Sequence, residues 1–126
     1  MPVATTLLVV VAVGHLLGYL PATLRHTYDS SWPDHARFHA FQSLLLVAGW
    51  DVAVVLLALG PVQRHEGWAL WVLVVYLVFV QLGYFVSMAA LPSGRPPGLV
   101  FHLLYLAAML MFAVGLAVAW RAPHGN

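Results

Sequence analysis

Four long apolar stretches, separated by short links that are polar or rich in proline and glycine, constrain this chain more than any other feature. A helix needs about 20 apolar residues to cross a bilayer. Helices of that kind are expected at residues 3–20, 32–59, 68–91 and 99–120. Because the links are short, consecutive helices must run in opposite directions. The sequence therefore predicts an all-α fold, an integral membrane four-helix up-down bundle, as a single transmembrane domain over residues 1–126.

Composition excludes several other classes of protein. Of the 126 residues, 63% are hydrophobic and 7% are charged, against about 45–50% and about 25% in a soluble domain. A net charge of +1 is too weak to indicate nucleic acid as a partner. The absence of cysteine removes disulfides, iron–sulfur clusters and thiolate metal ligands. The expected partner is a lipid bilayer that the chain crosses several times, with an orientation that the arginines do not reveal.

The links indicate where the helices end. Pro21 is expected to end the first helix and to begin a polar loop. The S-x-x-D pattern from Ser31 to Asp34 predicts a capped start for the second helix, near Trp32. Small residues four apart, at Gly14 and Gly18, predict a close approach between helices.

Histidines are the main store of polar chemistry, and antiparallel helices bring most of them to one end. His15 is expected about five residues before the end of the first helix, with His39 at a similar depth in the second. His35 lies one turn nearer the surface, and His102 lies about four residues into the fourth helix. His26 and Asp29 are expected in the loop above this layer.

This layer predicts a metal site. His35 and His39 are four residues apart on one helical face, a spacing that can chelate one ion. The proposed ligands are His15, His35, His39 and His102, with His26 or Asp29 as additions. Without thiolates, imidazoles suit iron or copper, with zinc or haem as further possibilities. The leading hypothesis is an iron- or copper-dependent oxidoreductase that acts on a lipophilic substrate held in the bundle. Side chains that could orient the ligands are Gln42, Gln81, Tyr84 and Tyr105.

Asp51 is a second candidate functional residue, together with Tyr84. A carboxylate inside a membrane is costly and is usually paired, protonated or functional. A hydrogen bond from Tyr76 or Trp71 on the third helix would compensate its burial. A role for Asp51 in proton transfer is inferred only from this general tendency of carboxylates inside membranes.

The segment Trp32-Pro33-Asp34-His35-Ala36-Arg37-Phe38-His39 resembles a W-P-x-H-A-R-F-H signature of small four-helix membrane proteins classed as a domain of unknown function. The resemblance implies that His35, Arg37 and His39 belong to a motif, and it implies no reaction. The chain is also similar in size and span count to the sterol isomerase and sigma-2 receptor superfamily. That group holds sterols and lipophilic amines, but it uses acidic residues where this chain has histidines or apolar residues.

Three alternatives to the metal-dependent oxidoreductase stay open, and so does the question of whether the chain is an enzyme. The first is a haem b-binding electron-transfer protein with two axial histidines. The second is a non-catalytic accessory or lipid-binding subunit, as a homo-oligomer or within a larger membrane complex. The third is a metal-free lipid isomerase in which His39 and Tyr84 move protons.

Overall fold

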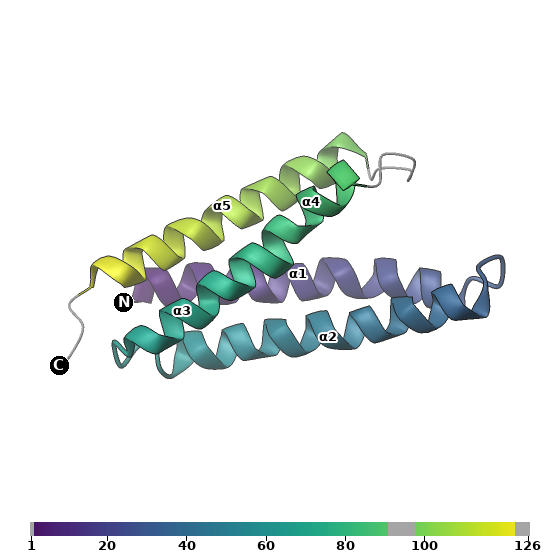
Figure 1. The fold of residues 1–126 in the computed structure, drawn as a ribbon. Helices are drawn as coiled ribbons and strands as arrows, with labels where there is room; N and C mark the ends of the chain where they lie inside the picture. Colours follow the sequence, from purple (N-terminus) through teal and green to yellow (C-terminus); the bar gives the residue numbers. More distant parts are fainter. Residues whose placement is uncertain (1, 91–97, 123–126) are drawn as a thin grey trace.

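Six helical segments make up the computed structural model, which describes residues 2–90 and 98–122. They are α1 (Pro2–Tyr28), α2 (Asp34–Leu59), α3 (Gly67–Tyr76), the π-helical η1 (Leu77–Leu82), α4 (Gly83–Ala90) and α5 (Leu99–Arg121). The segments α3, η1 and α4 follow one another without a break and form one rod. The described parts of the chain thus fold as four antiparallel rods without strands (Figure 1), which confirms the predicted all-α four-helix bundle.

Each of the four rods is long and apolar enough to cross a membrane. Their lengths in the described residues are 27, 26, 24 and 23 residues, with mean hydropathy between 2.0 and 2.3. Most of each rod faces outward, and large apolar side chains such as Leu17, Phe79 and Leu104 are exposed. Exposed apolar surface on this scale needs an apolar environment.

The rods form two antiparallel pairs that meet at one end and diverge at the other. Figure 1 shows α1 beside α2, and the α3–η1–α4 rod beside α5, with the pairs splayed at the end where α4 meets α5. The buried core lies where the pairs converge. It includes Ala4, Leu8, Val54, Leu73, Phe112 and Leu116. The diverging half therefore has room for a cavity between the pairs.

Helix α1 runs to Tyr28, so the prediction that it ends before Pro21 is wrong. Proline removes one backbone donor, but the turns on either side keep their own hydrogen bonds, and membrane helices tolerate this. Two side-chain hydrogen bonds stabilise the end of α1, one from α2 and one within α1. Arg37 Nε donates to the carbonyl of Thr27 at 2.8 Å, and Thr27 Oγ1 donates to the carbonyl of Thr23 at 3.0 Å. The extra two turns move every residue of α1 to a new depth relative to the helix end.

Helix α2 begins at Asp34 after Pro33, two residues later than predicted, and no side chain caps it. Ser31 is engaged elsewhere, because its backbone N–H and its hydroxyl both donate to Asp29 Oδ1, at 2.9 and 2.7 Å. The predicted capping box is therefore wrong. The third predicted helix is described from Gly67 to Ala90, and its expected last residue, 91, lies outside the described residues.

The close approach between helices occurs at Gly115. A Cβ atom there would lie 3.1 Å from Cβ of Leu7 and 3.4 Å from the carbonyl oxygen of Ala4. The same atom at Gly14 or Gly18 would meet nothing within 4 Å. The glycines expected to pack helices thus lie in open space, and α5 approaches α1 through Gly115 instead.

We expect Gly115→Val to destabilise the bundle by about 1–3 kcal/mol, because the larger side chain must displace α1 from α5. Gly14→Val is the matched control, since its side chain meets open space. Thermal unfolding of both variants in detergent micelles checks this. Equal midpoints for the two variants would contradict the assignment of Gly115 as the close contact.

Candidate functional site

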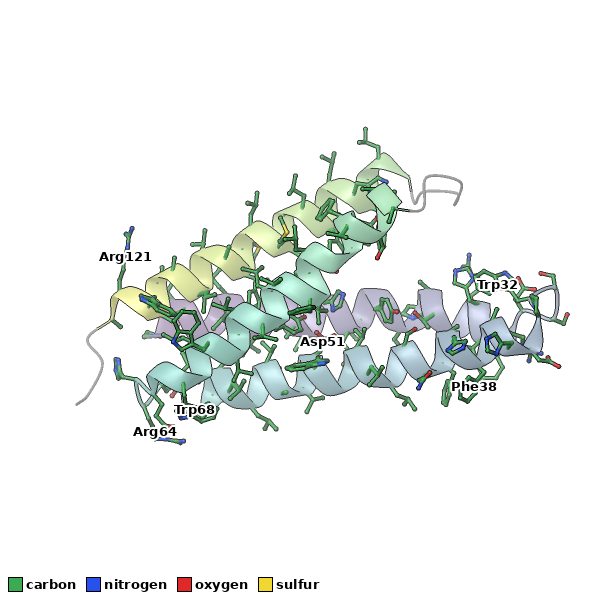
Figure 2. The ribbon with its side chains drawn as sticks, viewed as in Figure 1. Trp32, Phe38, Asp51, Arg64, Trp68 and Arg121 are labelled. Atoms are coloured by element: carbon green, nitrogen blue, oxygen red, sulfur yellow. The ribbon has the colours of Figure 1, made fainter. Side chains whose placement is uncertain are left out.

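A buried carboxylate stands at the middle of the bundle. Asp51, labelled in Figure 2 where the two helix pairs cross, is 1% exposed. His15 Nδ1 on α1 lies 3.0 and 3.1 Å from its two oxygens, and the Tyr76 hydroxyl on α3 donates to Oδ1 at 2.5 Å. Of the two donors predicted for Asp51, Tyr76 and Trp71, the structure shows Tyr76. The pairing with His15 is the feature that the sequence did not indicate.

The π-helical segment η1 extends this network by one residue. Gln81 is fully buried, and its Nε2 donates to the Tyr76 hydroxyl at 3.0 Å. In an α-helix, two residues five apart point about 140° away from each other, whereas the π-helix pairs i with i+5. The local change of helix type thus allows Tyr76 and Gln81 to meet. Among the described residues, Gln81 Oε1 has no hydrogen-bond partner.

The second ring nitrogen of His15 faces another tyrosine. Tyr105 on α5 places its hydroxyl oxygen 3.4 Å from His15 Nε2, and the same hydroxyl donates to the carbonyl of Val80 at 3.2 Å. With its one hydrogen on Val80, Tyr105 presents lone pairs to the imidazole. Both nitrogens of His15 therefore lie within hydrogen-bond distance of oxygen atoms, Nδ1 of Asp51 and Nε2 of Tyr105.

A cavity of about 670 Å³ opens beside His15 in the diverging half of the bundle. It follows α1 from His15 to His26, eleven residues or about 16 Å along the helix axis. Its walls are largely apolar and aromatic, with contributions from all four rods. The aromatic members include Trp32, Trp50, Phe79, Tyr84, Phe101 and Tyr105. The volume lies in the range of pockets that hold drug-sized molecules.

Two polar side chains, Tyr19 and Ser43, bond with each other partway along this cavity. Ser43 Oγ donates to the carbonyl of Ala40 at 2.9 Å, so it accepts from the Tyr19 hydroxyl at 3.3 Å. Both side chains line the cavity. An occupant would therefore meet polar groups at His15, at Tyr19 and Ser43, and at the polar lining residues Thr23, His26 and Ser87, with apolar and aromatic walls between them.

The histidines predicted to share one metal site are distributed over separate partners. His15 pairs with Asp51, and His102 Nδ1 bonds with the Tyr84 hydroxyl at 2.8 Å. His35 and His39 bond with each other, with 3.1 Å between their Nε2 atoms. Within residues 2–90 and 98–122, no group of three or more His, Cys, Asp or Glu side chains could hold a metal ion.

The two residues predicted in the loop, His26 and Asp29, are also engaged locally, and His26 lies in the last turn of α1 instead of in a loop. The His26 ring stacks on Trp32 with centroids 4.4 Å apart. Asp29 accepts two hydrogen bonds from Ser31, whose side chain is the chief reason that the pKa of the Asp29 carboxyl lies below its ordinary value. Asp29 is thus ionised at neutral pH and bonded within its own turn.

Two features of the fold explain why His15 and His102 do not meet the pair formed by His35 and His39. His15 lies halfway along α1, because the helix continues past Pro21 to Tyr28. His102 belongs to the α4–α5 end, which splays away from α1 and α2 (Figure 1). The depth predicted for His15 was therefore wrong. His15 lies at the level of Asp51, with which it pairs.

Of the candidate catalytic residues, Asp51 belongs to the buried network and Tyr84 lines the cavity. Tyr84 stacks on Tyr105 with ring centroids 4.2 Å apart. Its hydroxyl bonds with His102, and the described contacts do not join it to His39. Tyr105 and Gln81 were expected as partners of ligating histidines. Tyr105 contacts His15 directly, and Gln81 is linked to it through Tyr76 and Asp51.

Comparison of the chain with protein-family models, curated proteins and solved structures gives no match. The resemblance of residues 32–39 to a known signature therefore stays a prediction. The function must be argued from the site itself.

We expect Tyr76→Phe to lower stability by about 1–3 kcal/mol, because it leaves Gln81 Nε2 without an acceptor and Asp51 with one donor fewer. Gln81→Leu should cost less, since it also removes the buried Oε1 that has no partner. Unfolding of both variants in detergent measures the difference. A larger loss for Gln81→Leu than for Tyr76→Phe would contradict the order of bonds in this network.

Proposed function

We propose that this chain is a multi-pass integral membrane protein that binds an elongated lipophilic molecule in the cavity and exchanges a proton with it at His15. The observation that carries the proposal is the pairing of His15 with Asp51 at the inner end of an apolar cavity. The reaction class is a proton transfer of the isomerase type.

The distribution of side chains along the rods supports insertion in a bilayer. Figure 2 shows Arg64, Trp68 and Arg121 at one end of the molecule and Trp32 at the other. Tryptophan and arginine at helix ends are typical of membrane interfaces. Glu66 accepts from Arg64 Nε at 2.6 Å and from Trp68 Nε1 at 2.7 Å, and these bonds lower the pKa of its carboxyl. Charge is thus kept at the ends and compensated there.

Charge balance supports a proton stored on His15. An ionised Asp51 beside a neutral imidazole would leave one net negative charge in an apolar surrounding, which is costly. A single added proton makes the pair neutral overall. The hydrogen-bond pattern around His15 accommodates that proton, because both ring nitrogens face acceptor oxygens. His15 is therefore suited to act as a general acid towards an occupant of the cavity.

The proposed reaction is the shift of a carbon–carbon double bond, which needs no external oxidant or reductant. His15 Nε2 gives its proton to one carbon of a double bond, and the positive charge that develops is stabilised by the Asp51 carboxylate. The same nitrogen, now neutral, removes a proton from a neighbouring carbon, so the double bond shifts and His15 regains its proton. Asp51 holds the ring through Nδ1 and stabilises its charged form, as an orienting carboxylate does for a catalytic histidine.

The geometry supports this reaction more than a metal-dependent oxidation. The candidate ligands His15, His39 and His102 lie with three different partners, so they do not supply a common coordination sphere. The lipophilic substrate of that hypothesis fits the cavity equally well under proton transfer. A lipid-binding subunit without catalysis would use the same cavity, and it differs from the proposed isomerase in transferring no proton to the bound molecule.

The first experiment asks whether the cavity binds a lipophilic molecule. We expect a diazirine-labelled sterol in nanodiscs to crosslink to cavity residues of the wild-type protein. Ala40→Trp, which fills the cavity, should reduce this labelling several-fold. Leu45→Trp on the same helix is the control, because Leu45 is exposed on the outside of the bundle. Equal labelling in both variants, mapped by mass spectrometry to the outer surface, would contradict the cavity as a binding site.

The second experiment asks whether His15 moves protons. Nanodiscs loaded with an unsaturated sterol or a polyisoprenoid are incubated with the protein in D₂O, and the extracted lipid is analysed by mass spectrometry. We expect deuterium incorporation with the wild type and its loss in His15→Gln, while photolabelling of the cavity persists. His102→Gln serves as the control for a histidine that does not line the cavity. Labelling without deuterium incorporation in the wild type would favour the binding-only function.

A further inference from the structure

We propose that His35 and His39 form a two-nitrogen chelate for one divalent transition-metal ion, Zn²⁺ or Cu²⁺, at the start of α2. The site is separate from the cavity and does not depend on the proposed proton transfer, because neither histidine lines the cavity. It retains the i, i+4 pair of the predicted metal site without the other predicted ligands.

The two imidazoles already have the geometry of a chelate. Their Nε2 atoms are 3.1 Å apart, and the rings are nearly perpendicular, with an interplanar angle of 88° and centroids 4.4 Å apart. An ion at the usual Zn–N distance of about 2.0–2.1 Å from both nitrogens would make an N–metal–N angle of about 100°. This angle lies between the octahedral and tetrahedral values. Binding an ion would replace the hydrogen bond between the two nitrogens and release its proton, with little change in the distance between them.

The pair is accessible from the aqueous side of a membrane. Both side chains are exposed. They lie in the first two turns of α2, at the end of the molecule marked by Trp32 and Phe38 in Figure 2. Tryptophan and the neighbouring charged residues are typical of the interface, so a hydrated ion can reach the two nitrogens. An entry path is one of the requirements for a metal site.

The charged groups around the pair do not prevent binding. Arg37 is directed away, because its guanidinium bonds with the carbonyl of Thr27 and with Asp34 at 3.2 Å. The positive end of the α2 dipole opposes a cation, but by less than about tenfold in affinity. The exposed Asp34 carboxylate in the same turn acts in the opposite direction. The affinity for a cation is therefore determined mainly by the two imidazoles of His35 and His39.

Two protein nitrogens leave the remaining coordination positions open. Structural zinc sites have four protein ligands and catalytic ones usually three. The His35–His39 chelate would thus carry water, or a ligand from another molecule, in its other positions. We expect the affinity of the site for divalent ions to follow the general order for nitrogen ligands. Cu²⁺ should bind more tightly than Zn²⁺, and Mg²⁺ should not bind.

The test uses tag-free protein in detergent micelles, titrated with Zn²⁺ by calorimetry, and with Cu²⁺ by electron paramagnetic resonance. We expect one Zn²⁺ per chain and a Cu²⁺ signal with hyperfine coupling from two imidazole nitrogens. His35→Ala and His39→Ala should each weaken binding by roughly tenfold or more, because one ligand is lost. His102→Ala should leave the affinity unchanged, since His102 bonds with Tyr84 on the other helix pair.

A register variant makes the test specific for spacing. Asp34→His combined with His35→Ala keeps the number of histidines but separates them by five residues, about 140° around the helix. We expect this double variant to lose Zn²⁺ as fully as His39→Ala, with an unchanged circular dichroism spectrum. Binding that persists in the register variant or in His39→Ala would overturn the proposal, and so would the absence of a one-equivalent site in the wild type.

Discussion

The burial of one carboxylate governs the arrangement of the bundle. Asp51 is surrounded by apolar helices, and an isolated negative charge there would be strongly unfavourable. Two helices supply its partners, His15 from α1 and Tyr76 from α3, and Gln81 from η1 donates in turn to the Tyr76 hydroxyl. The network therefore fixes the rotation and depth of these rods relative to α2, and Leu8, Leu73 and the rest of the apolar core pack on one side of it.

The π-helical turn belongs to the same constraint. Changing the hydrogen-bonding period of a helix is unfavourable for the backbone, and such turns are frequent at functional sites. Here the turn brings Gln81 to the Tyr76 hydroxyl and directs the carbonyl of Val80 to Tyr105. Both interactions end on groups that contact Asp51 or His15. The irregularity thus organises the two tyrosines on which the buried pair depends.

The fold could be predicted because it depends on length and hydropathy, which are additive along the sequence. The need of a buried carboxylate for a donor on the neighbouring helix predicted Tyr76 or Trp71 as the partner of Asp51, and the structure selects Tyr76. The histidine layer failed for two reasons that are not local. Whether a helix continues through Pro21 depends on contacts such as Arg37 with Thr27, which come from another helix. The splay of α4 and α5, which carries His102 away, depends on packing at Gly115 and on the distant core.

The surroundings of each histidine determine which chemistry it can perform. A metal ligand must offer a lone pair to a solvent-accessible ion, and the exposed Nε2 atoms of His35 and His39, which hydrogen-bond to each other at 3.1 Å, can both do so once the proton between them is released. A proton carrier must be stabilised in its charged form and face a reactant, and His15 is held by Asp51 at the wall of a cavity. The same carboxylate that suits His15 to proton transfer occupies its Nδ1, while Nε2 faces Tyr105. We therefore propose proton transfer for His15 and metal binding for His35 and His39, because among the histidines that the structure describes only this pair brings two imidazole nitrogens to one accessible point.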